Sequence, residues 1–197
     1  MTGVESLVVR AQQGDDDAFA RLIVMHFAKA SATASMILGD SAAADDVVQD
    51  AMVQAWRSLP GLRDPQRFEA WLRRLVVNRC LNHRRAARRL DHAVGRLRPA
   101  LSSPGPERGV TDRDELGRAL RRLSLEQRAI LALRYGQDLT GVGIADALRI
   151  SPGAARSRLH AAVTALRAGL PPRKLLRASR SATRHSTSQW RARTRMS

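Results

Sequence analysis

Hydrophobic residues recur at helical spacing through a first block of the chain, from about residue 5 to residue 89. A spacing of three or four positions is clear in three runs: Phe19, Leu22, Ile23 and Phe27; Val47, Val48, Met52, Ala55 and Trp56; and Phe68, Trp71, Leu72, Leu75 and Val76. No segment alternates with the period of a β-strand. The pattern predicts an all-α fold, with Trp56 and Trp71 in the core.

Polar residues indicate where several helices begin. Each predicted cap has a short oxygen-bearing side chain that can accept a hydrogen bond from the first helical turn. The predicted caps are Ser41, Asp64 with Pro65 after it, Ser124 with Gln127 as a capping box, and Ser151 with Pro152 after it. Pro60 and Gly61 are expected to end the helix that Ser41 begins.

A second block, residues 112–170, ends in three predicted helices joined by tight turns, from residue 123 to residue 170. In the last helix, one side is apolar and predicted to be buried, whereas Arg156, Ser157 and His160 are predicted to face outward. The apolar side consists of Ala155, Leu159, Ala162, Val163 and Leu166. This arrangement is typical of a helix-turn-helix domain, which places one helix in the major groove of DNA.

The composition between and after the blocks predicts the domain organisation. Residues 91–111 contain three prolines, three glycines and two serines, which favours a flexible linker. Two small helical domains are therefore expected, residues 1–90 and residues 112–170. The basic, acid-free segment 171–197 is expected to be disordered, either as an inert extension or as a non-specific DNA contact.

Charge is unevenly distributed along the chain. The net charge is +16 and the sequence pI is about 11.7, which favours a polyanionic partner, nucleic acid ahead of a membrane. Residues 1–69 nevertheless hold 10 acidic and 6 basic residues, whereas residues 70–90 hold 7 arginines and no acid. Seven arginines on one helix repel each other unless phosphates neutralise them. The split predicts two surfaces for two different partners.

Several other classes of protein are disfavoured. Asp45, Asp46 and Asp50 could suggest a helical Mg²⁺-dependent enzyme, but no second acidic cluster accompanies them. Cys80 and His83 lack the second pair that a structural zinc site needs. We therefore expect no metal, no cofactor and no catalytic residues. Without an 18-residue apolar run or a secretory signal, the expected location is the cytoplasm, with no membrane insertion.

Two sequence patterns together resemble the extracytoplasmic-function (ECF) group of bacterial RNA polymerase sigma factors. The resemblance covers roughly residues 5–170. In the first block the pattern is carried by Asp45, Asp46, Gln49, Asp50, Trp56, Phe68, Trp71, Leu72, Asn78, Arg84 and Arg85. In the second block it is carried by Gly153, Ala155, Arg156, Ser157, Arg158 and Leu159, although two arginines usual in the family are replaced by Ala161 and Val163.

The resemblance implies a function and three sets of site residues. A region 2-like domain, residues 1–90, would bind core RNA polymerase and recognise and melt the promoter −10 element, and a region 4-like domain, residues 112–170, would recognise the −35 element. The implied polymerase-binding residues are Asp45, Asp46, Gln49 and Asp50. Those implied at the −10 element are Leu62, Arg63, Asn78, Arg79, Asn82, Arg85 and Arg88. Those implied at the −35 element are Ser151, Gly153, Arg156, Ser157, Arg158 and His160.

The implied partners are core RNA polymerase and promoter DNA, and an anti-sigma factor is left open as a third. The alternative hypothesis is a stand-alone helix-turn-helix regulator that binds DNA without polymerase. In that protein, the acidic helix at residues 41–57 would form a dimer or effector surface. Affinity for core polymerase separates the two hypotheses.

Overall fold

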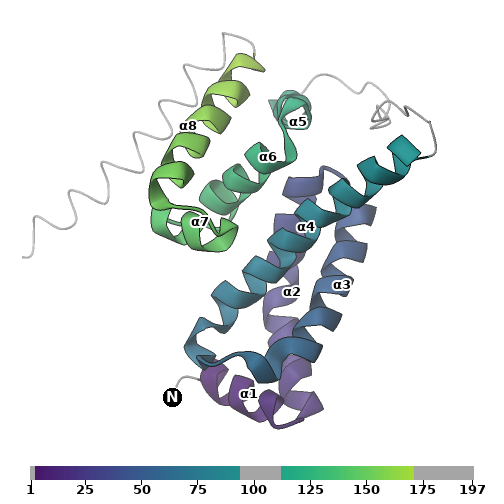
Figure 1. The fold of residues 1–197 in the computed structure, drawn as a ribbon, viewed down its shortest axis with the longest axis vertical. Coiled ribbons are helices and arrows are strands. Elements are labelled where there is room, and N and C mark those ends of the chain that lie inside the picture. Colours follow the sequence, from purple (N-terminus) through teal and green to yellow (C-terminus); the bar gives the residue numbers. More distant parts are fainter. Residues whose placement is uncertain (1–2, 94–111, 171–197) are drawn as a thin grey trace, which may run out of the picture.

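The computed structural model describes residues 3–93 and 112–170, and side chains within residues 3–83 and 115–170. The first block contains α1 (Gly3–Gln12), α2 (Asp16–Leu38), α3 (Ser41–Ser58) and α4 (Phe68–Ala93), with the 3-10 turns η1 (Leu59–Gly61) and η2 (Pro65–Arg67) between α3 and α4 (Figure 1). The second contains α5 (Asp112–Arg122), α6 (Leu125–Leu131), the π-helical turn η3 (Ala132–Gly136), α7 (Gly141–Leu148) and α8 (Pro152–Ala168). The all-α prediction is confirmed.

The helices form two groups that touch directly. In the first group α2 packs on α3, and both pack on α4. In the second group α6 and α7 both pack on α8. Figure 1 shows α4 running diagonally across the molecule, and contacts of α4 with α7 and of α2 with α6 join the two groups. Within the described ranges, no helix has both the length and the apolar character needed to cross a membrane.

Three of the four predicted caps are confirmed. The side chains of Asp64, Ser124 and Ser151 each accept a hydrogen bond from a backbone N–H in the first turn that follows, and Gln127 completes the capping box with Ser124. The prediction for Ser41 was wrong: Asp40 is the cap of α3, and its carboxylate accepts from the N–H groups of the two residues after Ser41.

The cap falls on Asp40 because of how α2 ends. Gly39 takes a left-handed conformation, with φ at +71°, and its N–H donates to the carbonyl of Ser35. A residue with a side chain seldom adopts this conformation, so glycine suits the tight connection between α2 and α3. Asp40 is then the one extended residue before the new helix, which is the position that a capping carboxylate requires.

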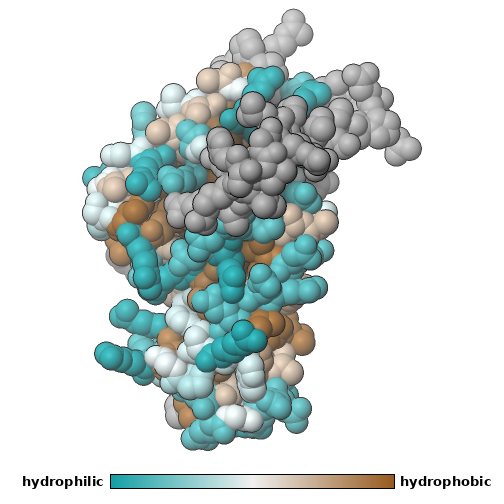
Figure 2. Space-filling model, turned by 45° about the vertical axis from the view of Figure 1, so that its right-hand side comes forward, coloured by the Kyte–Doolittle hydropathy of each residue, from teal (hydrophilic) through white to brown (hydrophobic). Residues whose placement is uncertain are grey.

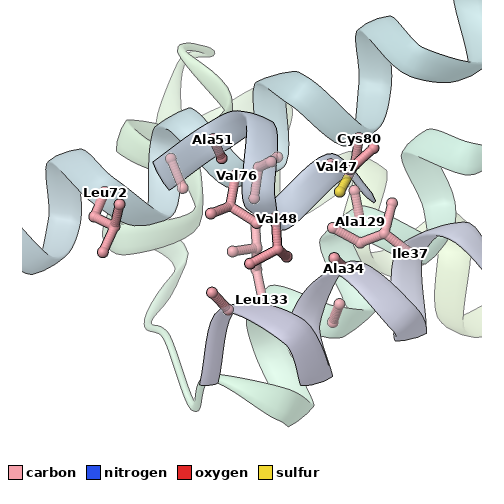
Figure 3. Close-up of a cluster of buried hydrophobic side chains, with 14 of the residues drawn as sticks. Ala34, Ile37, Val47, Val48, Ala51, Leu72, Val76, Cys80, Ala129 and Leu133 are labelled. Atoms are coloured by element: carbon pink, nitrogen blue, oxygen red, sulfur yellow. The ribbon is translucent and has the colours of Figure 1, made fainter. Parts of the chain in front are cut away.

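Buried apolar side chains from both groups form a continuous core. Figure 3 shows part of it, with residues of α2, α3 and α4 beside Ala129 and Leu133 of the second group. The prediction that Trp56 lies in this core was wrong, because 38% of its surface is exposed. Its ring packs on that of Phe19 with centroids 4.8 Å apart, at the outer edge of the α2–α3 pair.

Cys80 gives a direct test of this core. The side chain is fully buried, and burial raises the pKa of its thiol to about 12. Because the thiolate is the reactive form, native protein at pH 8 should alkylate at least 100-fold more slowly than protein unfolded in guanidinium. Mass spectrometry of iodoacetamide-treated samples measures this ratio, with the unfolded protein as the matched control. Equal rates in the two states would contradict the burial of Cys80.

Candidate nucleic-acid interface

The exposed side of α3 is acidic. Asp45, Asp46, Gln49 and Asp50 all face solvent, whereas Val47 and Val48 between them are buried. Positions 46, 49 and 50 are spaced by three and four residues, so these three side chains lie on one face of the helix. The structure thus brings together the residues that the sequence analysis assigned to polymerase binding.

Arg79 of the basic helix α4 contacts α3 beside the acidic face. Its Nε donates to Oε1 of Gln54 at 3.0 Å, and its Nη1 lies 3.8 Å from Oδ2 of Asp50. Partly exposed ion pairs of this kind contribute little to stability. Their effect here is positional, because they hold the guanidinium of Arg79 beside α3.

The described part of α4 presents amide and guanidinium groups on one side. Asn78, Arg79 and Asn82 line a pocket of about 300 Å³ together with Gln54 and Leu75. Such groups can donate to phosphates and can both donate to and accept from base edges. Arg85 and Arg88, assigned to the same interface, lie farther along α4 and outside the residues whose side chains are described.

The turn before α4 is held by a residue that the sequence analysis missed. Nε2 of Gln12, in α1, donates to the carbonyl oxygens of Leu59 at 3.1 Å and Leu62 at 2.6 Å. Leu62 is half-buried, whereas Arg63 is exposed and free to reach a partner. Gln12 therefore fixes the backbone from which Arg63 projects. The contact links residues about 50 positions apart, and no local signal in the sequence indicates it.

A polar cluster joins α2 to the start of α4. Nζ of Lys29 lies 2.6 Å from Oε1 of Glu69, and Arg73 bonds to the same carboxylate oxygen at 3.1 Å. The hydrogen bond from Lys29 is the main cause that lowers the pKa of Glu69. Burial lowers the pKa of the neighbouring His26, which favours its neutral form. The cluster keeps the start of α4 in a fixed position against α2.

The last two helices have the order and turn of a helix-turn-helix unit. The turn between α7 and α8 contains Arg149 in a left-handed conformation, and the hydroxyl of Ser151 accepts from the N–H of Ala154. Ser151 is therefore engaged as a cap. The outward side of α8 carries the other residues assigned to the −35 element, all exposed: Gly153, Arg156, Ser157, Arg158 and His160.

Arg156 and Arg158 differ in their surroundings. Nη1 of Arg158 lies 3.8 Å from the Glu126 carboxylate of α6, whereas Arg156 projects from the opposite side of the N-terminal turns of α8. On the face drawn in Figure 2, hydrophilic side chains cover most of the surface, with smaller hydrophobic patches between them. A helical fold with an acidic helix, a basic helix and an exposed helix-turn-helix unit defines the class of a DNA-binding transcription protein.

Family models match both helical groups. The model for sigma-70 region 2 matches residues 22–90, and the model for sigma-70 region 4 matches residues 113–166. Among the relatives, the ECF RNA polymerase sigma factor SigL of Mycobacterium tuberculosis is 36% identical over 136 residues, which cover 66% of this chain and 76% of SigL. The RNA polymerase sigma factor NccH of Alcaligenes xylosoxydans xylosoxydans is 35% identical over 82% of this chain and 93% of NccH.

Solved structures agree with these matches. CnrH, solved in complex with the cytosolic domain of CnrY, has a TM-score of 0.57 and 29% identity over 84% of this chain and 95% of the matched chain. The sigma factor RpoE of Bartonella quintana, solved with the anti-sigma factor NepR, has a TM-score of 0.63 over 77% of this chain and 95% of the matched chain. At 21% identity it shows the fold alone.

The chain belongs to the ECF group of the sigma-70 family of RNA polymerase sigma factors. Sigma factors are transcription initiation factors.

Proposed function

We propose that this sigma factor binds core RNA polymerase through the acidic face of α3, Asp45, Asp46, Gln49 and Asp50, and contacts promoter DNA through α4 and α8. The observation that carries the proposal is the separation of charge between neighbouring helices. An exposed acidic face suits a basic protein surface, and a helix with seven arginines and no acid from residue 70 to residue 90 suits phosphates. In a stand-alone regulator the same acidic face would instead be a dimer or effector surface.

We propose a separate function for each of the two groups of helices. Residues 1–90 would bind polymerase and melt the −10 element, and residues 112–170 would recognise the −35 element. Residues 91–111 would link them, and the basic segment 171–197 would remain outside both. The linker and the segment 171–197 lie outside the described residues, apart from the last turn of α4. We further propose that the protein acts in the cytoplasm, performs no catalysis of its own and is controlled by an anti-sigma factor.

Affinity for core polymerase tests the proposal against the stand-alone regulator. Purified core enzyme, immobilised on a biosensor surface, should bind the chain with a dissociation constant below about 1 μM. The matched control is core enzyme already saturated with another sigma factor, which should bind much less. Promoter binding by the chain alone, without measurable affinity for core polymerase, would favour the regulator.

Two arginines of α8 are predicted to differ in their effect on specificity. Arg156→Ala should relax the −35 sequence preference, because an arginine that reads guanine contributes about 1–3 kcal/mol of discrimination. Arg158→Ala should instead weaken binding to all sequences about equally and make the salt dependence shallower, as expected for a phosphate contact. Selection from a randomised −35 library measures both. An unchanged consensus for Arg156→Ala would refute its assignment to a base contact.

A further inference from the structure

Arg149, in the turn between α7 and α8, occupies a backbone position that ordinarily belongs to glycine. It follows the last residue of α7, with φ at +54° and ψ at +48°, in the left-handed region. Its N–H donates to the carbonyl of Asp146 at 3.3 Å, and the N–H of Ile150 donates to the carbonyl of Ala145 at 3.0 Å. These two hydrogen bonds form a Schellman motif, in which the left-handed residue is usually glycine. The turn therefore holds an arginine where its geometry favours glycine.

The end of α2 provides a comparison within the same chain. The corresponding residue there is Gly39, with φ at +71°. A residue with a Cβ atom is strained in this region, whereas glycine is not. Asp138 is the one other non-glycine residue with a positive φ in the part of the chain that the structure describes. Aspartate tolerates this conformation better than arginine, because its short side chain can form hydrogen bonds locally. The folded state alone thus gives no reason for an arginine at position 149.

The guanidinium of Arg149 is also without a partner among the described residues. The side chain is exposed, and it forms no hydrogen bond or ion pair within residues 3–83 and 115–170. Asp146, the nearest acid along the chain, instead lies 3.5 Å from Nη2 of Arg74 in α4. Arg158, by contrast, has its Nη1 3.8 Å from the carboxylate of Glu126. Arg149 is therefore a positive charge that no acidic group of the helix-turn-helix unit offsets.

The position of Arg149 places it at the edge of the DNA groove. In a helix-turn-helix unit the first helix crosses the DNA backbone, and the N-terminal end of the second enters the major groove. Arg149 joins these two helices and lies two residues before Ser151, the cap of α8. Two residues span at most about 7 Å. Since the groove is about 12 Å wide and a helix with its side chains about 10–12 Å across, phosphates flank the end of the inserted helix on both sides.

We propose that Arg149 is a phosphate-contact residue: its guanidinium binds the DNA backbone at the edge of the groove that α8 enters. The inference rests on the proposed function, because it requires α8 to contact DNA. A guanidinium can bind a phosphate through two parallel N–H donors. Strained backbone positions are typical of binding sites, where a ligand requires the side chain that they hold. The contact would add a positive charge to a unit in which Ala161 and Val163 replace two arginines usual in the family.

Glycine at this position should stabilise the fold and weaken DNA binding at the same time. Arg149→Gly removes both the strain and the charge, so the melting temperature should rise by about 1–4 °C while the affinity for DNA falls by about fivefold. Arg149→Ala removes the charge but keeps the Cβ atom, and should lose the same affinity without the rise in melting temperature. Arg149→Lys keeps the charge and should bind DNA within about twofold of the wild type.

Fluorescence anisotropy measures this affinity without polymerase, with the full-length chain and a labelled mixed-sequence duplex of about 20 base pairs. Between about 50 and 200 mM salt, the glycine and alanine variants should show a shallower dependence of log affinity on log salt, by about 0.9, as expected for the loss of one phosphate contact. A phosphate carries no sequence information. Selection from the randomised −35 library should therefore return the wild-type preference for both variants.

Arg118→Ala is the matched control, because it removes another exposed arginine of the same helical group. Arg118 lies in α5, beside the opposite end of α8: a Cβ atom at Gly169, which follows α8, would lie 3.3 Å from that of Ala119. This end of α8 is not the one that enters the groove. The control variant should bind the duplex with the affinity and the salt dependence of the wild type.

The proposal is overturned if Arg149→Gly raises the melting temperature but binds the duplex as tightly as the wild type. A loss of affinity with an unchanged salt dependence would also overturn it, because no phosphate contact would then have been removed. Arg158→Ala in the same assay reports on the proposed function. If Arg158→Ala weakens binding and Arg149→Gly does not, this inference alone fails. If neither weakens binding, the proposed contact of α8 with DNA fails as well.

Discussion

Asp46→Arg together with Asp50→Arg should weaken binding to core RNA polymerase by on the order of 100-fold, while the melting temperature stays close to that of the wild type. Both carboxylates are exposed on one face of α3, so the fold does not depend on them. Close charge pairs at protein interfaces have coupling energies of about 1.5–7 kcal/mol, and reversal converts attraction to repulsion. Biosensor titration of core enzyme with each variant measures the change.

The control for this experiment must carry the same change in net charge. Asp17→Arg with Asp138→Arg alters two other exposed acids, in α2 and after η3, and should leave core binding within about threefold of wild type. Asp46→Arg alone is also informative, because it leaves the contact of Asp50 with Arg79 intact. Undiminished binding by the Asp46/Asp50 double variant would show that another surface holds the polymerase.

Arg85→Ala together with Arg88→Ala should reduce promoter opening by about 10- to 100-fold and leave core binding unchanged. Each arginine is proposed to form a charge-assisted contact to DNA, and such hydrogen bonds contribute about 1.5–3 kcal/mol. Permanganate reactivity of thymines in the −10 region measures the open complex. Arg21→Ala with Arg57→Ala, two exposed arginines of α2 and α3, is the matched control. Unchanged reactivity in the Arg85/Arg88 variant would show that this part of α4 does not contact the DNA.

Much of the secondary structure could be predicted from the sequence because its signals are local. Asp64, Ser124 and Ser151 are caps as predicted, since each lies within three residues of the N–H group it accepts from. The prediction of Ser41 as a cap was wrong because α2 ends at Gly39, which leaves Asp40 as the extended residue before α3. A serine beside an aspartate gives no local sign of which residue is the cap.

Burial and long-range contacts were harder to predict. Trp56 has core spacing with Met52, yet it lies at the rim of α3, where Phe19 of α2 covers only part of its ring. Gln12 and Gln54 hold Leu62 and Arg79 in place, but a glutamine is ordinarily exposed and its sequence context does not indicate a partner about 25 or 50 positions away. The candidate site was predicted from charge and motif; the residues that position it became visible only in the fold.

The contact between the two groups of helices was invisible to sequence analysis for the same reason. From the sequence alone, Arg128 would be expected to be exposed, like most arginines of a basic chain. Leu133 would be expected to face the core of its own domain. Only the packing of α6 and η3 on α2 and α4 shows that both are buried between the two groups. Each group of helices was recognisable from its own pattern, whereas the contact between the groups was not.

Run-off transcription tests the central claim most directly. Core RNA polymerase, free of other sigma factors, is supplied with a library of genomic promoter fragments, with and without the purified chain, and the transcripts are sequenced from their 5′ ends. The account predicts transcripts that depend on the chain, begin at defined positions and share common −10 and −35 sequences upstream. The Asp46→Arg/Asp50→Arg variant should yield few or none. Identical transcripts with and without the wild-type chain would contradict the account.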